Sequence, residues 1–93
     1  MLKMAINEGP VAVQLNGGSK FFKMYKSGII NTQECAPEAN HAVLAVGYGK
    51  DPLSNEEYFI VKNSWGTKWG EKGFARISTD QSLFEEGMCG ILK

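Results

Sequence analysis

The sequence predicts a small, mainly β domain of the α+β class: an antiparallel, barrel-like sheet with one or two short helices at its margin. Two observations support this prediction. Short stretches rich in Val, Ile, Phe and Tyr recur along the 93 residues, and turn-forming Gly, Pro, Asn and Ser separate them. A chain of this length forms one small domain, and regularly spaced short strands favour a compact antiparallel sheet or barrel.

The first third of the chain predicts two short helices and two extended pieces. In segment 1–9 apolar residues repeat at helical spacing, and a Gly-Pro pair ends the helix. Segment 10–15 alternates apolar with small or polar residues, as a strand does. Segment 21–25 places aromatic and methionine side chains at helical spacing, which favours packing in the core over ligand binding. Residues 29–30 begin a short extended piece.

The central part of the chain predicts a β-hairpin. Apolar stretches at 42–46 and 58–61 flank a loop of turn-forming residues. Facing residues of an antiparallel hairpin lie at equal distances from the turn, so a turn centred on Pro52 places His41 opposite Asn63. An imidazole and a carboxamide on neighbouring strands are then close enough to hydrogen-bond.

The last third predicts further strands joined by irregular segments. Residues 66–73 contain three glycines and predict a turn. Residues 74–79 alternate in polarity and predict a strand. Residues 80–87 are polar and predict a loop, and residues 89–92 begin a final strand.

The composition argues against several classes of function. Ten basic and ten acidic side chains give a formal net charge of zero, so we expect neither nucleic acid nor an anionic membrane as a partner. No apolar stretch reaches the ~18 residues that a membrane-spanning helix needs. The N-terminus lacks the apolar stretch and the cleavage site of a signal peptide.

The two cysteines, Cys35 and Cys89, are consistent with a disulfide, a metal-binding pair or two reduced thiols. A structural zinc site takes about four ligands, and two cysteines with the single histidine of the chain fall short of that number. We therefore predict no metal site and no cofactor. The residues alone leave the disulfide and the reduced thiols open.

His41 and Asn63 form the candidate chemical site. A single histidine at the start of a strand is usually structural, because neutral imidazole is an ordinary polar side chain. An asparagine at the end of a strand is commonly a turn or cap residue. The predicted spacing brings the two side chains within hydrogen-bond reach, so this pair is the candidate chemistry of the chain.

Two segments carry a resemblance to a known family. NHAVLAVGYG at 40–49 and YFIVKNSWGTKWG at 58–70 resemble the histidine and asparagine signatures of papain-like cysteine proteases, the cathepsin group. The resemblance extends from about Val11 to Leu92. It implies that residues 1–93 form a single domain, the right-hand, C-terminal lobe of the papain-like fold.

The resemblance also implies that part of the catalytic domain is missing. The family's nucleophile lies upstream, in a glutamine-then-C-G-x-C-W block that this sequence lacks. A secreted-type protease also carries a targeting segment and a propeptide, and neither is recognisable here. We therefore expect the chain to be a fragment whose N-terminal lobe, with the nucleophilic cysteine, lies elsewhere.

The resemblance implies a role for each residue of the site. His41 is the general base and the ion-pair partner of the thiol, because only the thiolate attacks and an imidazolium stabilises it. Asn63 orients the imidazole through its side-chain oxygen. Trp65 covers the hydrogen bond between them, and Trp69 lines the leaving-group side of the cleft.

The resemblance further implies a disulfide and a substrate pocket. Cys35 and Cys89 match positions that the family joins in a disulfide. Such a bond forms in an oxidising compartment, either lysosomal, vacuolar or extracellular. Gln14, Ala39 and Ala42 match positions near the pocket for the substrate's second residue, which small side chains would leave roomy.

The function implied is the C-terminal half of a papain-like cysteine endopeptidase, inactive alone because it lacks the nucleophile. Its partners would be the N-terminal lobe, protein or peptide substrates and cystatin-type inhibitors. The alternative is a non-catalytic β module that has kept the protease fold and binds a protein partner.

Overall fold

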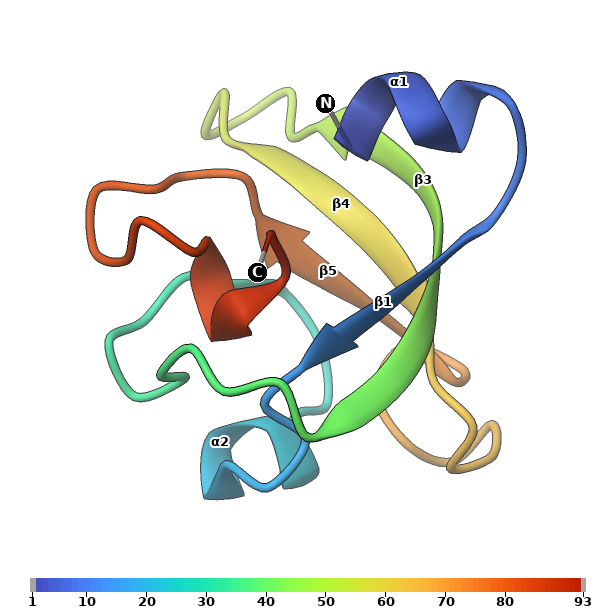
Figure 1. The fold of residues 1–93 in the computed structure, drawn as a ribbon, viewed down its shortest axis with the longest axis vertical. Helices are drawn as coiled ribbons and strands as arrows, with labels where there is room; N and C mark the ends of the chain where they lie inside the picture. The colour runs from blue at the N-terminus through green and yellow to red at the C-terminus, as the bar shows by residue number, and fades with distance from the viewer. Residues whose placement is uncertain (1, 93) are drawn as a thin grey trace.

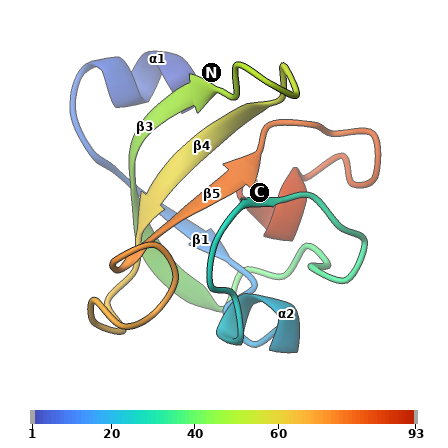
Figure 2. The ribbon, with the colours of Figure 1, turned by 180° about the vertical axis from the view of Figure 1, so that it is seen from behind.

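A curved five-stranded sheet is the framework around which the chain folds (Figures 1 and 2). The computed structural model describes residues 2–92. Its strand order is β1-β3-β4-β5-β2. The elements are α1 (Leu2–Asn7), β1 (Val11–Leu15), α2 (Lys20–Lys23), β2 (Ile29–Ile30), β3 (His41–Lys50), β4 (Glu57–Lys62), β5 (Phe74–Ser78) and a 3-10 turn (Met88–Gly90). Both predicted helices form, and Met1, where the first was expected to begin, lies outside the described residues.

The fold is mostly strand with few short helices, as predicted, but the sheet is not a closed antiparallel barrel. Strand β2 runs parallel to β5, so the sheet is mixed, and β1 and β2 form its two edges. Closure would require these edge strands to pair. β2 offers only two residues for a ladder, and the backbone N–H at the end of β1, that of Asn16, donates to Cys89 O instead (2.9 Å).

The β3–β4 hairpin forms, with a register that differs from the predicted one. Leu44 pairs with Lys62 and Ala45 with Val61, and a bulge at Val46 shifts the pairing by one residue beyond it. An extra residue on one strand accounts for this shift, because a bulge opposes two residues to one. His41 pairs with β1 rather than with β4, and β4 ends before Asn63.

The core fills the concave side of the sheet. Apolar side chains from the strands meet those of α2 and of the C-terminal segment there, and several are completely shielded from solvent. In β5, Ala75 and Ile77 are buried and alternate with the partly exposed Phe74 and Arg76, as the predicted strand periodicity requires, whereas Ser78 at the end of the strand is buried as well. The largest fully buried apolar side chains are Leu15, Phe22, Ile30, Val61, Ile77 and Met88.

The predicted strand at residues 89–92 is wrong, because this segment contains a 3-10 turn. The backbone of Gly87, Cys89 and Gly90 has positive φ (85°, 59° and 79°), which no β-strand allows. Cys89 is held there by tertiary contacts: its N–H donates to Cys35 O (3.0 Å), and its carbonyl accepts from Asn16. These partners lie far away in the sequence, so the local pattern does not contain them.

A partly buried ion pair joins the turn before β5 to the strand itself. Arg76 donates two hydrogen bonds to the carboxylate of Glu71 (2.9 and 2.8 Å). The same carboxylate accepts from the backbone N–H of Gly28 (3.1 Å). The hydroxyl of Tyr25 donates to Gly28 O and accepts from the Arg76 N–H, so that β2, β5 and the turn share one polar network.

We expect Glu71→Gln to lower stability at neutral pH but not in acid. The hydrogen bonds from Arg76 hold the pKa of Glu71 below its ordinary value. The stabilisation is therefore present at neutral pH and is lost as the pH falls through that lowered pKa. The variant should lose about 1 kcal/mol at pH 7, the scale of a well-aligned ion pair. Urea unfolding of both proteins across pH measures the difference, and a difference that persists at low pH would contradict this account.

Candidate functional site

The site lies where β3 begins and β4 has just ended. Neighbouring antiparallel strands bring the start of one beside the end of the other, so His41 and Asn63 meet at this end of the sheet. The Nε2 atom of His41 lies 2.8 Å from Oδ1 of Asn63, within hydrogen-bond distance. The structure thus brings the two residues together, although they are not a directly paired couple of the ladder.

Backbone hydrogen bonds hold both the main chain and the side chain of Asn63. Asn63 is 4% exposed. Its backbone N–H donates a hydrogen bond to Gly73 O (2.9 Å), which fixes the main chain at this point. Its Oδ1 also accepts a hydrogen bond from the backbone N–H of Ser64 (2.7 Å). Its Nδ2 is buried and has no hydrogen-bond partner within residues 2–92.

Trp65 covers one face of the imidazole. Its ring stacks on that of His41 with centroids 4.8 Å apart and an interplanar angle of 25°. Trp65 is 40% exposed, so part of its indole reaches solvent. Leu44 pairs with Lys62. If that pairing is extended by three residues past the end of β4, residue 65 comes to lie opposite His41, which agrees with the observed stack.

Trp69 belongs to the core under the site. It is 9% exposed, and its indole N–H donates to Phe22 O (3.1 Å). Its ring packs against Phe22 and edge-on against Trp65, with centroids 4.9 and 5.5 Å apart. Little of its surface is free to line a cleft.

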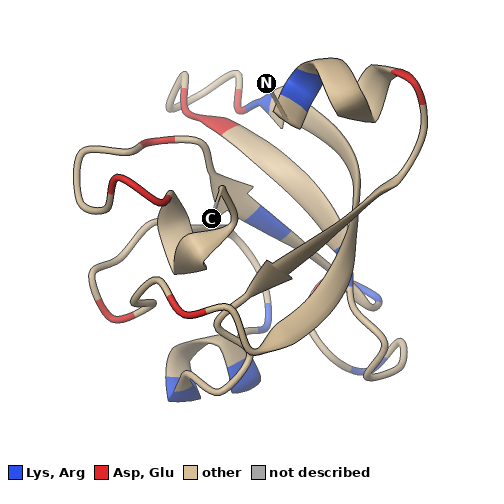
Figure 3. Ribbon diagram, viewed as in Figure 1, with Lys and Arg blue, Asp and Glu red and all other residues tan. Residues whose placement is uncertain are grey.

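Phe22 supports the site from below, a role that the sequence did not reveal. It is fully buried and contacts the rings of His41, Trp65 and Trp69, with centroids 6.4, 5.6 and 4.9 Å away. The aromatic spacing of segment 21–25 predicted a core side chain but not what it packs against. The helix around it, α2, carries Lys20 and Lys23 (Figure 3).

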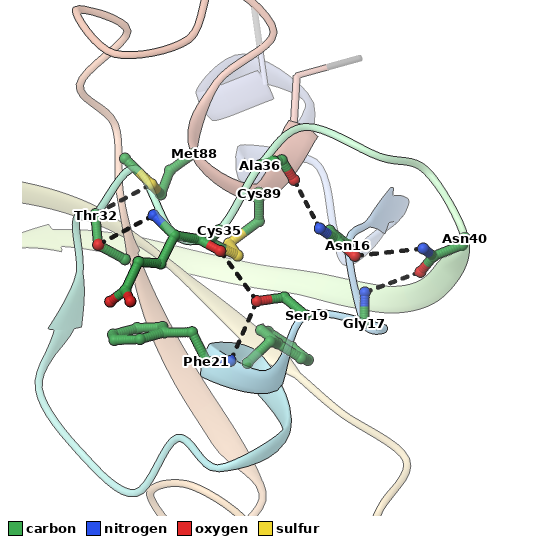
Figure 4. Close-up of a disulfide and its surroundings, with 12 residues drawn as sticks. Asn16, Gly17, Ser19, Phe21, Thr32, Cys35, Ala36, Asn40, Met88 and Cys89 are labelled. Atoms are coloured by element: carbon green, nitrogen blue, oxygen red, sulfur yellow. Dashed lines mark hydrogen bonds between the residues drawn. A yellow bond between two sulfur atoms is a disulfide. The ribbon is translucent and has the colours of Figure 1, made fainter.

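A polar network beside the disulfide holds the segment that leads into His41 (Figure 4). Asn40 accepts from the Gly17 N–H (3.0 Å) and donates to the side chain of Asn16 (3.3 Å). Asn16 in turn donates to Ala36 O (2.9 Å). The sequence pointed to neither asparagine as a support.

Cys35 and Cys89 form the disulfide that the family resemblance implied. The bond joins the loop after β2 to the 3-10 turn, close to the network around Asn16 (Figure 4). Both cysteines of the chain are used in it, so no free thiol remains.

Two of the three expected pocket residues lie together. Gln14 and Ala42 pair across β1 and β3, and both line a groove of about 410 Å³. A second, more apolar groove of about 460 Å³ also includes Ala42 and extends to Asn63. Ala39 is exposed in the loop before β3 and contributes to neither groove.

The described part of the chain contains neither a candidate metal site nor a membrane-spanning helix. Across residues 2–92, no three His, Cys, Asp or Glu side chains come close enough to hold a metal ion. Over the same residues, no helix is long and apolar enough to cross a membrane.

Comparison with known proteins identifies the family. Residues 1–93 match the family described as papain family cysteine protease. The chain is 43% identical over 90 residues to germination-specific cysteine protease 1 of Arabidopsis thaliana, covering 97% of this chain and 23% of that protein. It is 42% identical over 92 residues to a cathepsin L-like protein of Caenorhabditis elegans, covering 97% and 26%.

Solved structures agree with the sequence comparison. The bromelain protease of Ananas comosus, in complex with the E64 inhibitor, superposes with a TM-score of 0.89 at 42% identity, covering 98% of this chain and 40% of that one. Its sheet matches the C-terminal lobe of the papain fold. Measured against the two relatives from Arabidopsis thaliana and Caenorhabditis elegans, the chain spans about a quarter of their length. The chain belongs to the papain family of cysteine proteases.

Proposed function

We propose that this chain supplies the general base and the orienting amide of a papain-like cysteine endopeptidase, and that a polypeptide outside these 93 residues supplies the thiol. The hydrogen bond between His41 Nε2 and Asn63 Oδ1, beside the imidazole face on which Trp65 stacks, carries the proposal. It is the base–orienter half of a nucleophilic triad, with an amide in place of the usual carboxylate. The other half must come from elsewhere, because Cys35 and Cys89 are bonded to each other.

The geometry suits His41 to proton transfer with a thiol. Asn63 occupies Nε2, which leaves Nδ1 for the nucleophile. His41 takes the thiol proton, and the resulting imidazolium favours the thiolate. The sulfur attacks the peptide carbonyl carbon, and His41 gives its proton to the amine as the C–N bond breaks. Water, deprotonated by His41, then hydrolyses the thioester to a carboxylic acid and restores the thiol.

We assign the binding partners from the two grooves beside the site. The apolar groove that runs from Ala12 and Leu44 to Asn63 would be covered by the N-terminal lobe, and the one at Gln14 and Ala42 would hold a substrate side chain. Protein or peptide substrates, and cystatin-type inhibitors that occupy such clefts, would bind between the lobes. The disulfide suits an oxidising lysosomal, vacuolar or extracellular compartment.

We expect the 93-residue chain to hydrolyse no unfolded protein substrate, and a single chain in which a relative's N-terminal lobe precedes it to be active. His41→Ala in that fusion should abolish activity, because the thiol loses its base and the amine its proton donor. Leu53→Ala, a change on the hairpin turn away from the site, is the control and should leave activity unchanged. A fusion that folds, binds substrate and hydrolyses it equally well without His41 would refute the proposal.

The alternative, a non-catalytic module that binds a protein partner, is supported by the exposed Leu44 and Trp65. It predicts that the fusion with the N-terminal lobe assembles but hydrolyses nothing. The same assay therefore separates the two functions.

A further inference from the structure

We propose that the backbone N–H of Ser64 is a positioning group: it fixes the ring tautomer of His41, with the proton on Nε2 and with Nδ1 unprotonated. The tautomer is a property of this chain and does not depend on the proposed function. Only its use, to accept a thiol proton at Nδ1, rests on that function.

The first step concerns the atom that faces Ser64. A backbone N–H can only donate a hydrogen bond. The Asn63 side-chain atom that lies 2.7 Å from it must therefore be the carbonyl oxygen, because the amide nitrogen is also a donor. A flipped carboxamide would set two donors against each other. The N–H of Ser64 thus selects one of the two amide orientations.

The second step concerns the other end of the amide. The Nδ2 of Asn63 is buried and makes no hydrogen bond within the part of the chain that the structure describes. No acceptor there competes to hold the amide in either orientation. Among the described residues, Ser64 N–H and the ring of His41 are the partners of this side chain. Of these two partners, only the backbone N–H is always a hydrogen-bond donor. A ring nitrogen of His41 can be a donor or an acceptor, since either nitrogen can carry the proton.

The third step passes this choice on to the imidazole. With Oδ1 toward Ser64, the same oxygen lies 2.8 Å from Nε2 of His41. An oxygen accepts and does not donate, so Nε2 must carry the proton, and the neutral ring then has its lone pair on Nδ1. The order of control runs from the backbone of residue 64, through the Asn63 amide, to the ring of His41.

The test reads the tautomer directly. His41 is the only histidine of the chain, so nitrogen NMR of the ring-labelled 93-residue protein, recorded in alkaline solution, yields signals from this imidazole alone. We expect the Nε2–H form to dominate in the wild type and in Ser64→Ala, which keeps the N–H. Ser64→Pro removes the N–H, and the ratio of Nε2–H to Nδ1–H should fall roughly five- to tenfold, the effect of one lost hydrogen bond.

A second pair of variants separates this role from a merely structural one. Asn63→Asp presents an acceptor at either oxygen, so in that background Ser64→Pro should leave the Nε2–H form dominant. If Ser64→Pro does not fold, a semisynthetic chain with an ester in place of the amide at residue 64 removes the N–H without a ring, and the same two backgrounds are compared. A wild type with mainly Nδ1–H, a ratio unchanged by loss of the N–H, or a loss that Asn63→Asp does not restore would each overturn the proposal. Absence of peptidase activity would not bear on it.

Discussion

Replacing Cys35 and Cys89 together with alanine is expected to lower the free energy of unfolding by about 4 kcal/mol. The disulfide joins residues 54 apart in sequence. On the chain-entropy model, a cross-link of that span lowers the conformational entropy of the unfolded chain and so raises its free energy by about 4 kcal/mol. Domains of this size are commonly stable by only about 5–15 kcal/mol. The change should therefore bring the protein close to unfolding at room temperature.

Urea unfolding followed by tryptophan fluorescence measures this effect. The oxidised wild type and the wild type kept in reductant provide the comparison, because the reduced protein should resemble the double variant if the bond itself, and not the volume of sulfur, is responsible. Reduction should also loosen the loop before His41, since Cys89 holds Cys35 and Asn16 by backbone hydrogen bonds. A folded double variant that loses less than about 1 kcal/mol would contradict the chain-entropy argument.

Phe22→Ala is expected to destabilise the protein by about 3–5 kcal/mol and to disturb the site at the same time. The side chain is fully buried, and removing a core aromatic ring loses both its transfer free energy and the contacts around the cavity left behind. That cavity would lie beneath the rings of His41, Trp65 and Trp69. The stack of Trp65 on His41 should therefore become less ordered.

Phe21→Ala is the matched control for this prediction. Phe21 is the neighbouring residue of the same helix but is 38% exposed, so its loss should have a much smaller effect on unfolding. The ring signals of His41 and the tryptophan fluorescence report on the site in each variant. Equal destabilisation by the two changes, or an undisturbed His41 in a folded Phe22→Ala protein, would show that Phe22 does not support the site as described.

Local patterns in the sequence predicted those parts of the fold that local interactions decide. The alternation of residues 74–77 was visible in the sequence and recurs in β5, and it stops at Ser78, which is buried next to Ile77. The hairpin was predicted from two apolar stretches and a turn. Its register was not, because Lys50 pairs with Glu57, so the turn is centred between residues 53 and 54 rather than on Pro52, and the bulge at Val46 then shifts the pairing by one residue. The turn-centred spacing therefore placed Asn63 opposite His41, where the observed register points Trp65.

The proximity of His41 and Asn63 did not depend on that exact register, because the two side chains reach each other at the ends of their strands. Other parts of the site depend on contacts distant in sequence. Nothing near Phe22 indicates that it lies under the imidazole. Nothing near Cys89 indicates a left-handed backbone, which the contacts to Cys35 and Asn16 hold in place. Local propensity is a weak guide where tertiary contacts of this kind compete with it.

Strand β2 can join the sheet only after β5 has formed, because its pairing runs from Ile29 and Ile30 to Arg76 and Ile77. The β3–β4 hairpin closes over a short turn and can form within roughly 1–10 μs. The parallel contact must instead close a loop between residues 47 apart in sequence, about half of the chain, and such closures come late. During synthesis, β2 leaves the ribosome long before β5 and must wait unpaired. Because Cys89 follows β5 in the chain, the disulfide cannot form during synthesis before the partner strand of β2 has also been made.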